Sequence, residues 1–432
     1  MSRPYQDDTD TGITTTRAES PEWLDTLRRS AAERFSAVGF PTSRDEEWRF
    51  TPVTPIATTS WRDSTGSVRI SPQELDPYLF GHPEWTKLVF VNGVYSPGLS
   101  SEGNLPEGVR VVSLAEAVLE GVATDDLGRH APIESSPFTA LNTGRFRDGA
   151  FVQVPAGQDL QQPIHLLFVA TEEAGGSVIQ PRNLLIVGRG SRASLIESYV
   201  ALGSAQSHWT NTITEVVAEA NCWVEHTRIQ REGERAYHIG GTYVSQQRDS
   251  HYRSFSLAMG GALSRHNLQT RLTDENVEAL LYGLYLTRGD QLVDNHTVIY
   301  HDQPNCRSWE VYKGILEDRS RAVFNGKVFV RPEAQKTDAK QTNRNLLLSD
   351  RARVDTKPQL EIFADDVKCT HGATVGQLDD LALFYARSRG VPAEKAQRLL
   401  TYAFAAEVIS EVAIQPVRAE LERLVRERLG PR

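Results

Sequence analysis

The stretch 317-EDRSRAVFNGKVFV-330 decides the fold, because it joins a polar turn to an apolar strand in a unit that recurs along the chain. Similar units are 188-GRGSRASLIESYV-200, 218-AEANCWVEH-226, 289-GDQLVDNHTVIYH-301 and 349-SDRARVDTKPQLEIF-363. Their spacing is roughly 12 to 30 residues, the size of half a coil or a whole coil of a parallel β-helix, in which each coil buries its face only by stacking on the next. The recurrence therefore favours a β-solenoid.

Short apolar or alternating runs fill the region from about residue 149 to 375, and no long helical pattern interrupts them. Further examples are 164-IHLLFVA-170, 183-NLLIVG-188, 279-ALLYGLYLT-287 and 345-NLLLS-349. So many short strands are typical of a sandwich, a barrel or a solenoid. The irregular repeat favours the solenoid, and an ordinary antiparallel β domain is the alternative.

The segment before this region predicts a mixed, partly helical domain over residues 19–145, preceded by a flexible N-terminus over residues 1–18. Ser20 as a cap and Pro21 at the first helical position predict the start of an amphipathic helix. The other expected features are a strand with an Asn-Gly turn at 88–96, a short helix at 113–122 and a linker at 130–138.

The segment after it turns helical again, which predicts a C-terminal helical domain over residues 377–432 behind a β-helix core over residues 146–376. Helical patterns cover 379–391, 393–413 and 416–429. The last carries a narrow apolar stripe opposite many charges, which is typical of a helix that packs on its own domain or docks a partner.

Composition excludes several classes of protein. Of the 432 residues, 39% are hydrophobic and 24% charged, as in an ordinary globular chain. The net charge of -9 argues against a nucleic-acid partner, since phosphate binding needs clustered Lys and Arg. No apolar run approaches the roughly 20 residues that cross a bilayer, and no secretory signal is recognisable. We therefore expect no membrane partner and a cytoplasmic location.

Familiar enzyme signatures are missing from the sequence. The nearest look-alike of a phosphate-binding loop, 326-GKV-328, lacks the following hydroxyl residue and the glycine spacing, so we do not expect ATP hydrolysis by this chain. No dinucleotide fingerprint, zinc-protease motif or nucleophile elbow occurs either.

The stretch 365-DDVKCTHGATVGQLDD-380 places Cys369 and His371 two residues apart in a chain with three cysteines. On an extended segment such residues point to the same side, so a thiolate and an imidazole could both reach a zinc ion or an iron-sulfur cluster. A stable metal site needs three or four ligands, and the neighbourhood offers no further ones. The missing ligands would come from Cys222, Cys306 or His301, or from another chain.

Two other interpretations of this pair stay open at this point. Val367 shares the parity of Cys369 and His371, so a regular strand with that side inward would bury all three in a core. A Cys-His nucleophile pair would need a third, orienting group, for which Asp365 and Asp366 are candidates, but no oxyanion-hole signature accompanies them. Cys222 is expected to pack in a strand and Cys306 to be exposed in a turn.

Three longer segments carry a resemblance to a known family. They are 334-AQKTDAKQTNRNLLLSDRARVDTKPQLEIFADDVKCTHGATVGQLDDLALFYARSRGV-391, 138-FTALNTGRFRDGAFVQVPAG-157 and 45-DEEWRFTPV-53. Together they resemble the SufB/SufD family of iron-sulfur cluster assembly proteins over most of the chain. The SufB branch tends to have His-Glu-Ala after the cysteine, whereas Gly372 and Ala373 follow His371 here. The resemblance is therefore closer to the SufD branch.

The resemblance implies a right-handed parallel β-helix with helical N- and C-terminal regions, working in a complex of SufB, SufD and two copies of the ATPase SufC. It implies that this chain is a non-catalytic scaffold whose C-terminal helices dock SufC and whose β-helix pairs with that of SufB. Cys369 and His371 would then lie at the SufB interface and share a transient iron-sulfur cluster with it. SufC would supply ATP hydrolysis.

Some consequences of the resemblance are left open. A reduced flavin is associated with such complexes, but no motif for it occurs in this chain. A homodimer of the isolated chain is a second arrangement. Two rival functions are a β-helix carbohydrate lyase or hydrolase, against which no acidic cluster with calcium-loop spacing is found, and a purely structural subunit in which Cys369 and His371 only pack.

Overall fold

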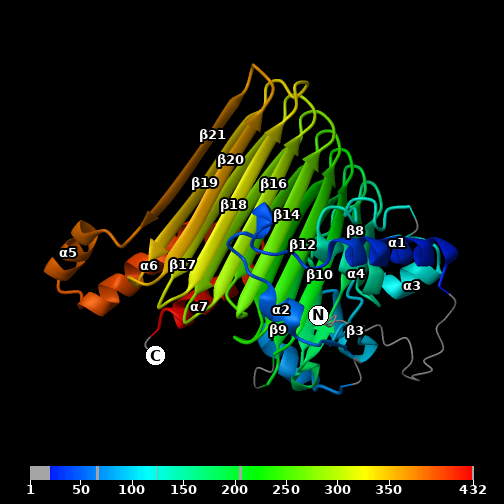
Figure 1. Cartoon of the computed structure of the whole chain (residues 1–432), viewed down its shortest axis with the longest axis horizontal. Coiled ribbons are helices and arrows are strands. Elements are labelled where there is room, and N and C mark those ends of the chain that lie inside the picture. Colours follow the sequence, from blue (N-terminus) through cyan, green and yellow to red (C-terminus); the bar gives the residue numbers. More distant parts are fainter. Residues whose placement is uncertain (1–19, 65–67, 124, 204–206, 431–432) are drawn as a thin grey trace.

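The computed structural model describes residues 20–430 except 65–67, 124 and 204–206. The flexible N-terminus that we expected over residues 1–18 lies outside the described residues. A stack of strands runs along the long axis of the molecule, with the N-terminal helices near one end and the C-terminal helices near the other (Figure 1). No helix of the described chain is long and apolar enough to cross a membrane.

The stack is a parallel β-helix of about eight turns, confirming the solenoid and excluding the antiparallel alternative. Each turn places one strand in each of two sheets. The first sheet contains β5 (Ala150–Val154), β8 (Arg182–Val187), β10 (Trp209–Ala218), β12 (Tyr237–Gln246), β14 (Leu263–Leu272), β16 (Leu292–His301), β18 (Arg321–Val330) and β20 (Arg353–Ile362). The second contains β6 (Ile164–Ala170), β9 (Arg192–Ala201), β11 (Trp223–Arg231), β13 (His251–Ala258), β15 (Glu278–Thr287), β17 (Arg307–Leu316), β19 (Asp338–Leu347) and β21 (Lys368–Gly376).

The turns between the two sheets stack in a ladder of their own. One residue of each turn has a positive φ: Asn221 (59°), Asp249 (59°), Asn276 (57°), Asn305 (61°) and Lys336 (64°). In each coil the N–H of this residue donates to a carbonyl of the next turn, as from Asn305 to Gln335 at 2.9 Å. Asn and Asp tolerate the left-handed conformation better than other side-chain residues do. The polar turns that punctuate the sequence are therefore the corners of the solenoid.

Alternate side chains of each strand point into the solenoid, and two of the largest have a glycine as their register neighbour on the adjacent strand of the same sheet. A Cβ on Gly283 would overlap the ring of Tyr312, and one on Gly314 would overlap the ring of Tyr285. Both tyrosines are fully buried. The interior is packed by side chains rather than hollow, as close packing of protein cores requires.

Short strands and helices cover the N-terminal end of the solenoid. Strands β2 and β3 pair antiparallel through the expected Asn-Gly turn, and β4 pairs antiparallel with β5. The strands outside the eight turns are β1 (Arg62–Asp63), β2 (Lys87–Val91), β3 (Val94–Tyr95), β4 (Arg110–Ser113) and β7 (Ser177–Ile179). The helices are α1 (Glu22–Val38), α2 (Thr54–Thr58), α3 (Leu114–Leu119), α4 (Pro137–Arg145) and the 3₁₀ turns η1 (Glu46–Trp48), η2 (Pro72–Tyr78), η3 (Pro97–Leu99) and η4 (Glu172–Ala174).

Two predictions for this region are wrong in detail. Helix α1 starts after Pro21, which occupies the cap position without a side-chain hydrogen bond, so Ser20 does not cap it. The expected linker at 130–138 ends inside helix α4, which is capped by the Ser136 hydroxyl and buried against α1 and β10. Its small, polar sequence hid the helix because packing on the solenoid, rather than an apolar stripe, stabilises it.

The segment 45–53 crosses the outer face of the first sheet (Figure 1). Trp48 is buried there beneath the guanidinium of Arg265, whose Cζ lies 3.7 Å from the ring centroid. Arg265 is buried with Asp294, at 2.7 Å, and the hydroxyl of Thr51 also donates to Asp294. These contacts attach the segment 45–53 to the outer face of β14 and β16.

Helices α6 (Ala393–Ile409) and α7 (Gln415–Arg428) pack on the outer face of the second sheet and confirm the expected apolar stripe. Val417, Leu421, Leu424 and Val425 are buried in one cluster with outward side chains of β15 and β17. Helix α5 (Asp380–Ser388) has no buried residue and lies away from the solenoid (Figure 1).

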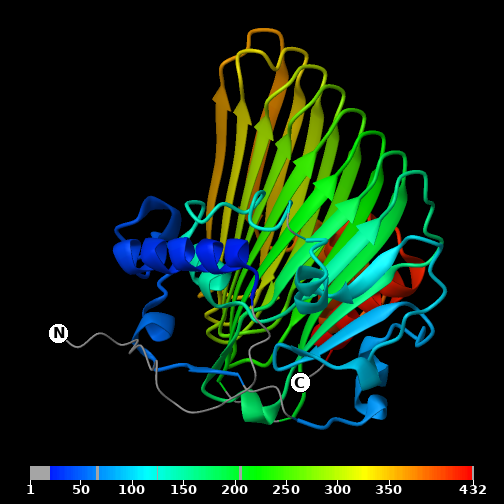
Figure 2. The same ribbon diagram turned by 90° about the vertical axis from the view of Figure 1, so that its right-hand side faces the viewer.

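The two ends of the solenoid differ. At the N-terminal end the sheets finish in short antiparallel strands, whereas at the C-terminal end β20 and β21 are the last strands of their sheets (Figure 2). No other strand of the described chain pairs with their outer edges. Exposed sheet edges offer unpaired backbone groups to another chain.

Asn305→Val tests the turn ladder. A β-branched residue in the left-handed conformation costs about 1–2 kcal/mol, so we expect a lower thermal unfolding midpoint. Asn305→Gly is the matched control, because glycine adopts this φ without strain, and it should keep the wild-type midpoint within error. Equal midpoints for the two variants would contradict the role of the corner.

Candidate metal-ligating site at the open end

Cys369 and His371 both lie on β21 and point toward the inside of the solenoid. In the parallel register Cys369 stands beside Ala339, and His371 stands beside Gln341. Ala339 and Gln341 are both buried inward residues of β19. The expected same-side placement of the two side chains is therefore confirmed.

The two side chains are nevertheless accessible, because no further coil of the described chain covers β21. His371 is exposed, and Cys369 is half-buried beside an apolar cluster that includes Val328, Val330 and Ala339. In any earlier coil the same two positions are core: Ser308 and Glu310 are each 1% exposed. The choice between core packing and a reactive surface thus depends on position along the solenoid, and the last coil exposes the pair.

Burial raises the pKa of the Cys369 thiol above its ordinary value, and the neighbouring carboxylate of Asp338 adds to the rise. A thiol of raised pKa is mostly protonated at neutral pH and is a poor nucleophile. This disfavours the Cys-His nucleophile interpretation. A metal ion would displace the proton and bind the thiolate, so metal binding at Cys369 should release a proton.

The distant residues considered as further ligands are not brought to this site. Among the residues that the structure describes, no group of three or more His, Cys, Asp and Glu side chains could hold a metal ion. His301 is buried and hydrogen-bonds Ser308 through Nε2 at 2.9 Å, and burial lowers its pKa to about 3. Cys222 is packed in the core, as expected.

Cys306 corrects a sequence prediction. It is fully buried rather than exposed, because the turn 303–306 folds its fourth residue inward at the start of β17. Its thiol donates to the carbonyl of Asp274 at 3.2 Å, and burial raises its pKa to about 11. Cys369 is therefore the one accessible thiol of the described chain.

Sequence reasoning missed two polar residues that lie directly behind His371. Glu310 on β17 pairs in register with Gln341 on β19, which pairs with His371 on β21. The amide Nε2 of Gln341 donates to Glu310 Oε2 at 2.7 Å. Both side chains are buried, and burial raises the pKa of Glu310 to about 7. The signal in the sequence is the coil spacing, which links these positions only once the register is known.

Comparison with known proteins identifies the family. Residues 168–404 match the SufBD core domain of the SUF system for iron-sulfur cluster assembly, and residues 3–166 match the N-terminal region of SufBD proteins. The chain belongs to the SufBD family. The chemistry at β21 therefore sits in a protein of iron-sulfur cluster assembly, as the resemblance implied.

Relatives of this SufBD-family chain are similar over nearly their whole length. An iron-sulfur cluster assembly SufBD family protein of Synechocystis is 34% identical over 92% of this chain and 89% of its own. The iron-sulfur cluster assembly protein SufD of Escherichia coli is 34% identical over 90% of each chain. SufD of Bacillus subtilis is 26% identical over 94% of each chain. These matches support the assembly function and give no support to a carbohydrate-active enzyme.

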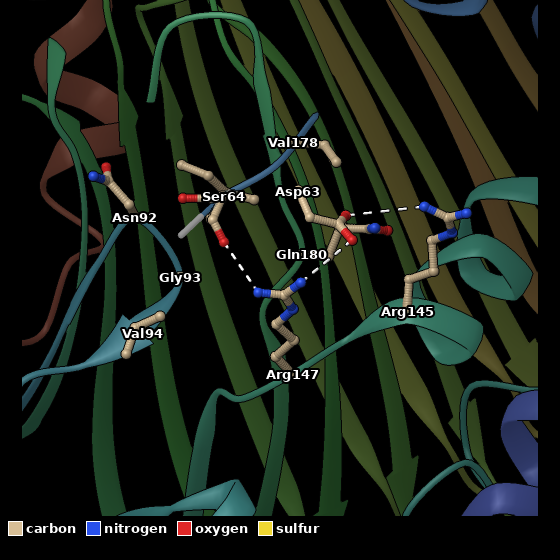
Figure 3. Close-up of a pocket in the computed structure, with 10 residues that line it drawn as sticks. Asp63, Ser64, Asn92, Gly93, Val94, Arg145, Arg147, Val178 and Gln180 are labelled. Carbon is tan, nitrogen blue, oxygen red and sulfur yellow. Dashed lines mark hydrogen bonds and ion pairs between the residues drawn. The ribbon is translucent and has the colours of Figure 1, made fainter. Parts of the chain in front are cut away.

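A small polar pocket lies at the other end of this SufBD-family chain, where β1 pairs with β7 (Figure 3). Asp63 stands between two arginines, 3.9 Å from Arg145 and 3.4 Å from Arg147. Arg147 also donates to the carbonyl of Ser64 at 3.3 Å. Because Asp63 pairs with both guanidinium groups, the pocket is not a strong anion site.

The titration of Glu310 predicts a pH dependence of stability. Burial raises its pKa from 4.5 to about 7, so the folded chain holds a proton that the unfolded chain releases. Stability should therefore fall as the pH rises from 4.5 to about 7 and then level off, by about 3 kcal/mol in all. Glu310→Gln, which cannot ionise, should lack this decline.

The measurement is thermal unfolding of both proteins at about pH 5 and about pH 8, where the Glu310 carboxyl is mostly protonated and mostly ionised in the fold. The unfolding midpoint of Glu310→Gln, relative to that of the wild type, should be higher at about pH 8 than at about pH 5. An equal difference at both values would contradict a buried, neutral carboxyl at this position.

Proposed function

We propose that this SufBD-family chain is a SufD-like scaffold subunit that contributes Cys369 and His371 to the assembly of a nascent iron-sulfur cluster. The observation that carries the proposal is the accessibility of both groups at the end of the solenoid, while equivalent positions in earlier coils are buried. A thiolate and an imidazole are ligand types of iron-sulfur clusters.

Two ligands are too few for a stable site, and the remaining ones come from a partner. No strand among residues 20–430 that the structure describes pairs with the outer edges of β20 and β21, and Ile362, Phe363 and Val375 are exposed beside them, at 37%, 58% and 46%. An apolar end with two open sheet edges suits another β-helix that continues the stack. We propose that SufB occupies this end and that the cluster forms transiently between the two chains. A second copy of this chain uses the same end when SufB is absent.

The C-terminal helices are the proposed docking site for the ATPase SufC. Helix α5 exposes Leu381, Phe384 and Tyr385 on one side, at 78%, 70% and 62%. Apolar groups exposed to this extent on one short helix are typical of a protein-protein interface. ATP hydrolysis is then supplied by SufC, since this chain has no phosphate-binding loop. We assign no residue to a reduced flavin.

A physical link joins the helices to the last coils. Lys313 on β17 is 2% exposed, and its ammonium group pairs with Glu407 and donates to the carbonyl of Phe404 at 3.0 Å, both on α6. Strand β17 pairs with β19, which pairs with β21. A movement of α6 during the ATP cycle would therefore shift the strands that hold Cys369 and His371. This requires that SufC makes different contacts with this chain before and after the movement.

Cys369→Ser and His371→Ala test the ligand role in the complex co-expressed with SufB and SufC. Each should lower the iron content and visible cluster absorption after anaerobic reconstitution, because each removes a ligand. Thr370→Ala is the matched control, since Thr370 lies between them and its side chain points to the opposite side of the strand. Undiminished cluster yield in an intact complex of the two variants would favour a purely structural subunit.

Leu381→Asp with Phe384→Asp tests the docking helix. Two carboxylates on the apolar side of α5 should reduce co-purification of SufC by at least about tenfold, since each removes about 1–2 kcal/mol of apolar burial. Leu119→Asp is the control, because Leu119 is 60% exposed on α3 near the other end of the solenoid. Undisturbed binding of SufC by the double variant would place the docking site elsewhere.

A further inference from the structure

We propose that Gln341, held by Glu310, is a positioning residue that orients the imidazole of His371 for metal binding. The inference rests on the proposed ligand role of His371. It concerns which ring nitrogen of His371 faces the open end, and therefore how the chain prepares the ligand before any metal arrives.

The three residues occupy one inward row of the second sheet in consecutive coils. Glu310 stands beside Gln341, and Gln341 stands beside His371. Neighbouring strands lie about 4.8 Å apart, so the side-chain amide of Gln341 spans the distance to either neighbour. In this row Gln341, which does not ionise, is the one residue between Glu310 and His371.

Gln341 uses only one side of its amide within the described part of the chain. Its Nε2 donates to Glu310 Oε2 at 2.7 Å, whereas its Oε1 is buried and accepts no hydrogen bond. A buried acceptor without a donor costs about 1–3 kcal/mol. The bond to Glu310 places the NH₂ group of the amide toward Glu310 and its oxygen away from this bond. The unused oxygen is thus the atom that Gln341 offers to its other neighbour.

The opposite sheet leaves room for this arrangement. Gly326 on β18 faces Gln341 across the interior, and a Cβ at Gly326 would overlap Gln341 Nε2. Gly326 has an ordinary φ, so the left-handed conformation does not explain the glycine. The space for the amide explains it.

The two side chains make no hydrogen bond in this structure, and the proposal is that an imidazole N–H of His371 turns to Gln341 Oε1 and supplies the missing donor. When one ring nitrogen donates to Gln341 Oε1, the other has a free lone pair and is the metal ligand. Outer hydrogen bonds of this kind fix the tautomer and the ring orientation of histidine ligands, and their loss typically weakens metal binding by about 10–100-fold. Glu310 and Gln341 therefore orient the His371 ligand without contacting the metal themselves.

Gln341→Met tests the inference, because it keeps the length of the side chain and removes the acceptor. Nitrogen-15 NMR of the histidine rings of the full chain, without metal, reports the tautomer of His371, whose signals are identified by their loss in His371→Ala. We expect one tautomer to predominate in the wild type and the ratio to change about fivefold in Gln341→Met, the effect of losing one net hydrogen bond. An unchanged ratio overturns the inference.

Asn343→Leu is the matched control. Asn343 lies on the same strand and the same inward side, but it stands beside Ala373 and hydrogen-bonds Tyr285 Oη at 3.0 Å. It should leave the His371 tautomer unchanged; a shift as large as that of Gln341→Met would mean that general loosening of the core is responsible and would overturn the inference.

A second pair of variants changes Glu310, the residue that is bonded to Gln341. Glu310→Gln retains an acceptor for the Gln341 amide and should keep the wild-type tautomer ratio, whereas Glu310→Met should change it in the same direction as Gln341→Met.

Failure of the positioning role of Gln341 and failure of the ligand role of His371 are distinguishable. If Gln341→Met changes the tautomer but His371→Ala leaves the cluster yield of the complex intact, the ligand role fails and the positioning stands. If the tautomer does not respond while His371→Ala abolishes the cluster, the positioning alone fails.

Discussion

The structure depends on one constraint: a coil of this β-helix buries its inward side chains only against the coils on either side of it. The ladder of left-handed corners from Asn221 to Lys336 holds the coils in register, and the strand pairings carry that register from one sheet position to the next. Each coil therefore supplies part of its neighbour's core. The last coil has a neighbour on one side only, so its inward residues meet solvent.

This asymmetry turns ordinary core positions into candidate ligands. The positions held by Ser308 and Glu310 in one coil, and by Ala339 and Gln341 in the next, are held by Cys369 and His371 in the last. Only the final pair is accessible. The N-terminal end avoids the same exposure with antiparallel strands and helices, whereas no strand of the described chain covers the last coil.

The polar residues behind the open end and helix α6 contact β17 from opposite faces of the second sheet. Inside the solenoid Gln341 stands beside His371 of β21 and is bonded to Glu310, while Lys313 anchors α6 to the outer face of β17. Alternation of side chains along a strand makes this possible, because Glu310 and Lys313 lie on one strand but on opposite faces. Strand pairing thus connects β17, which anchors α6, with β21, which carries Cys369 and His371.

The sequence alone favoured the solenoid and determined its helical ends, the absence of a phosphate-binding loop and the two-residue spacing of Cys369 and His371, because local patterns encode turns, strand alternation and motif spacing. It could not show that Cys306 is buried, that α4 is a helix, or that Glu310 and Gln341 stand behind His371, since these depend on which coil stacks on which. The accessibility of Cys369 and His371 was likewise undecided by their spacing. Only the tertiary structure decided it, because burial of an inward residue requires a further coil, and β21 has none.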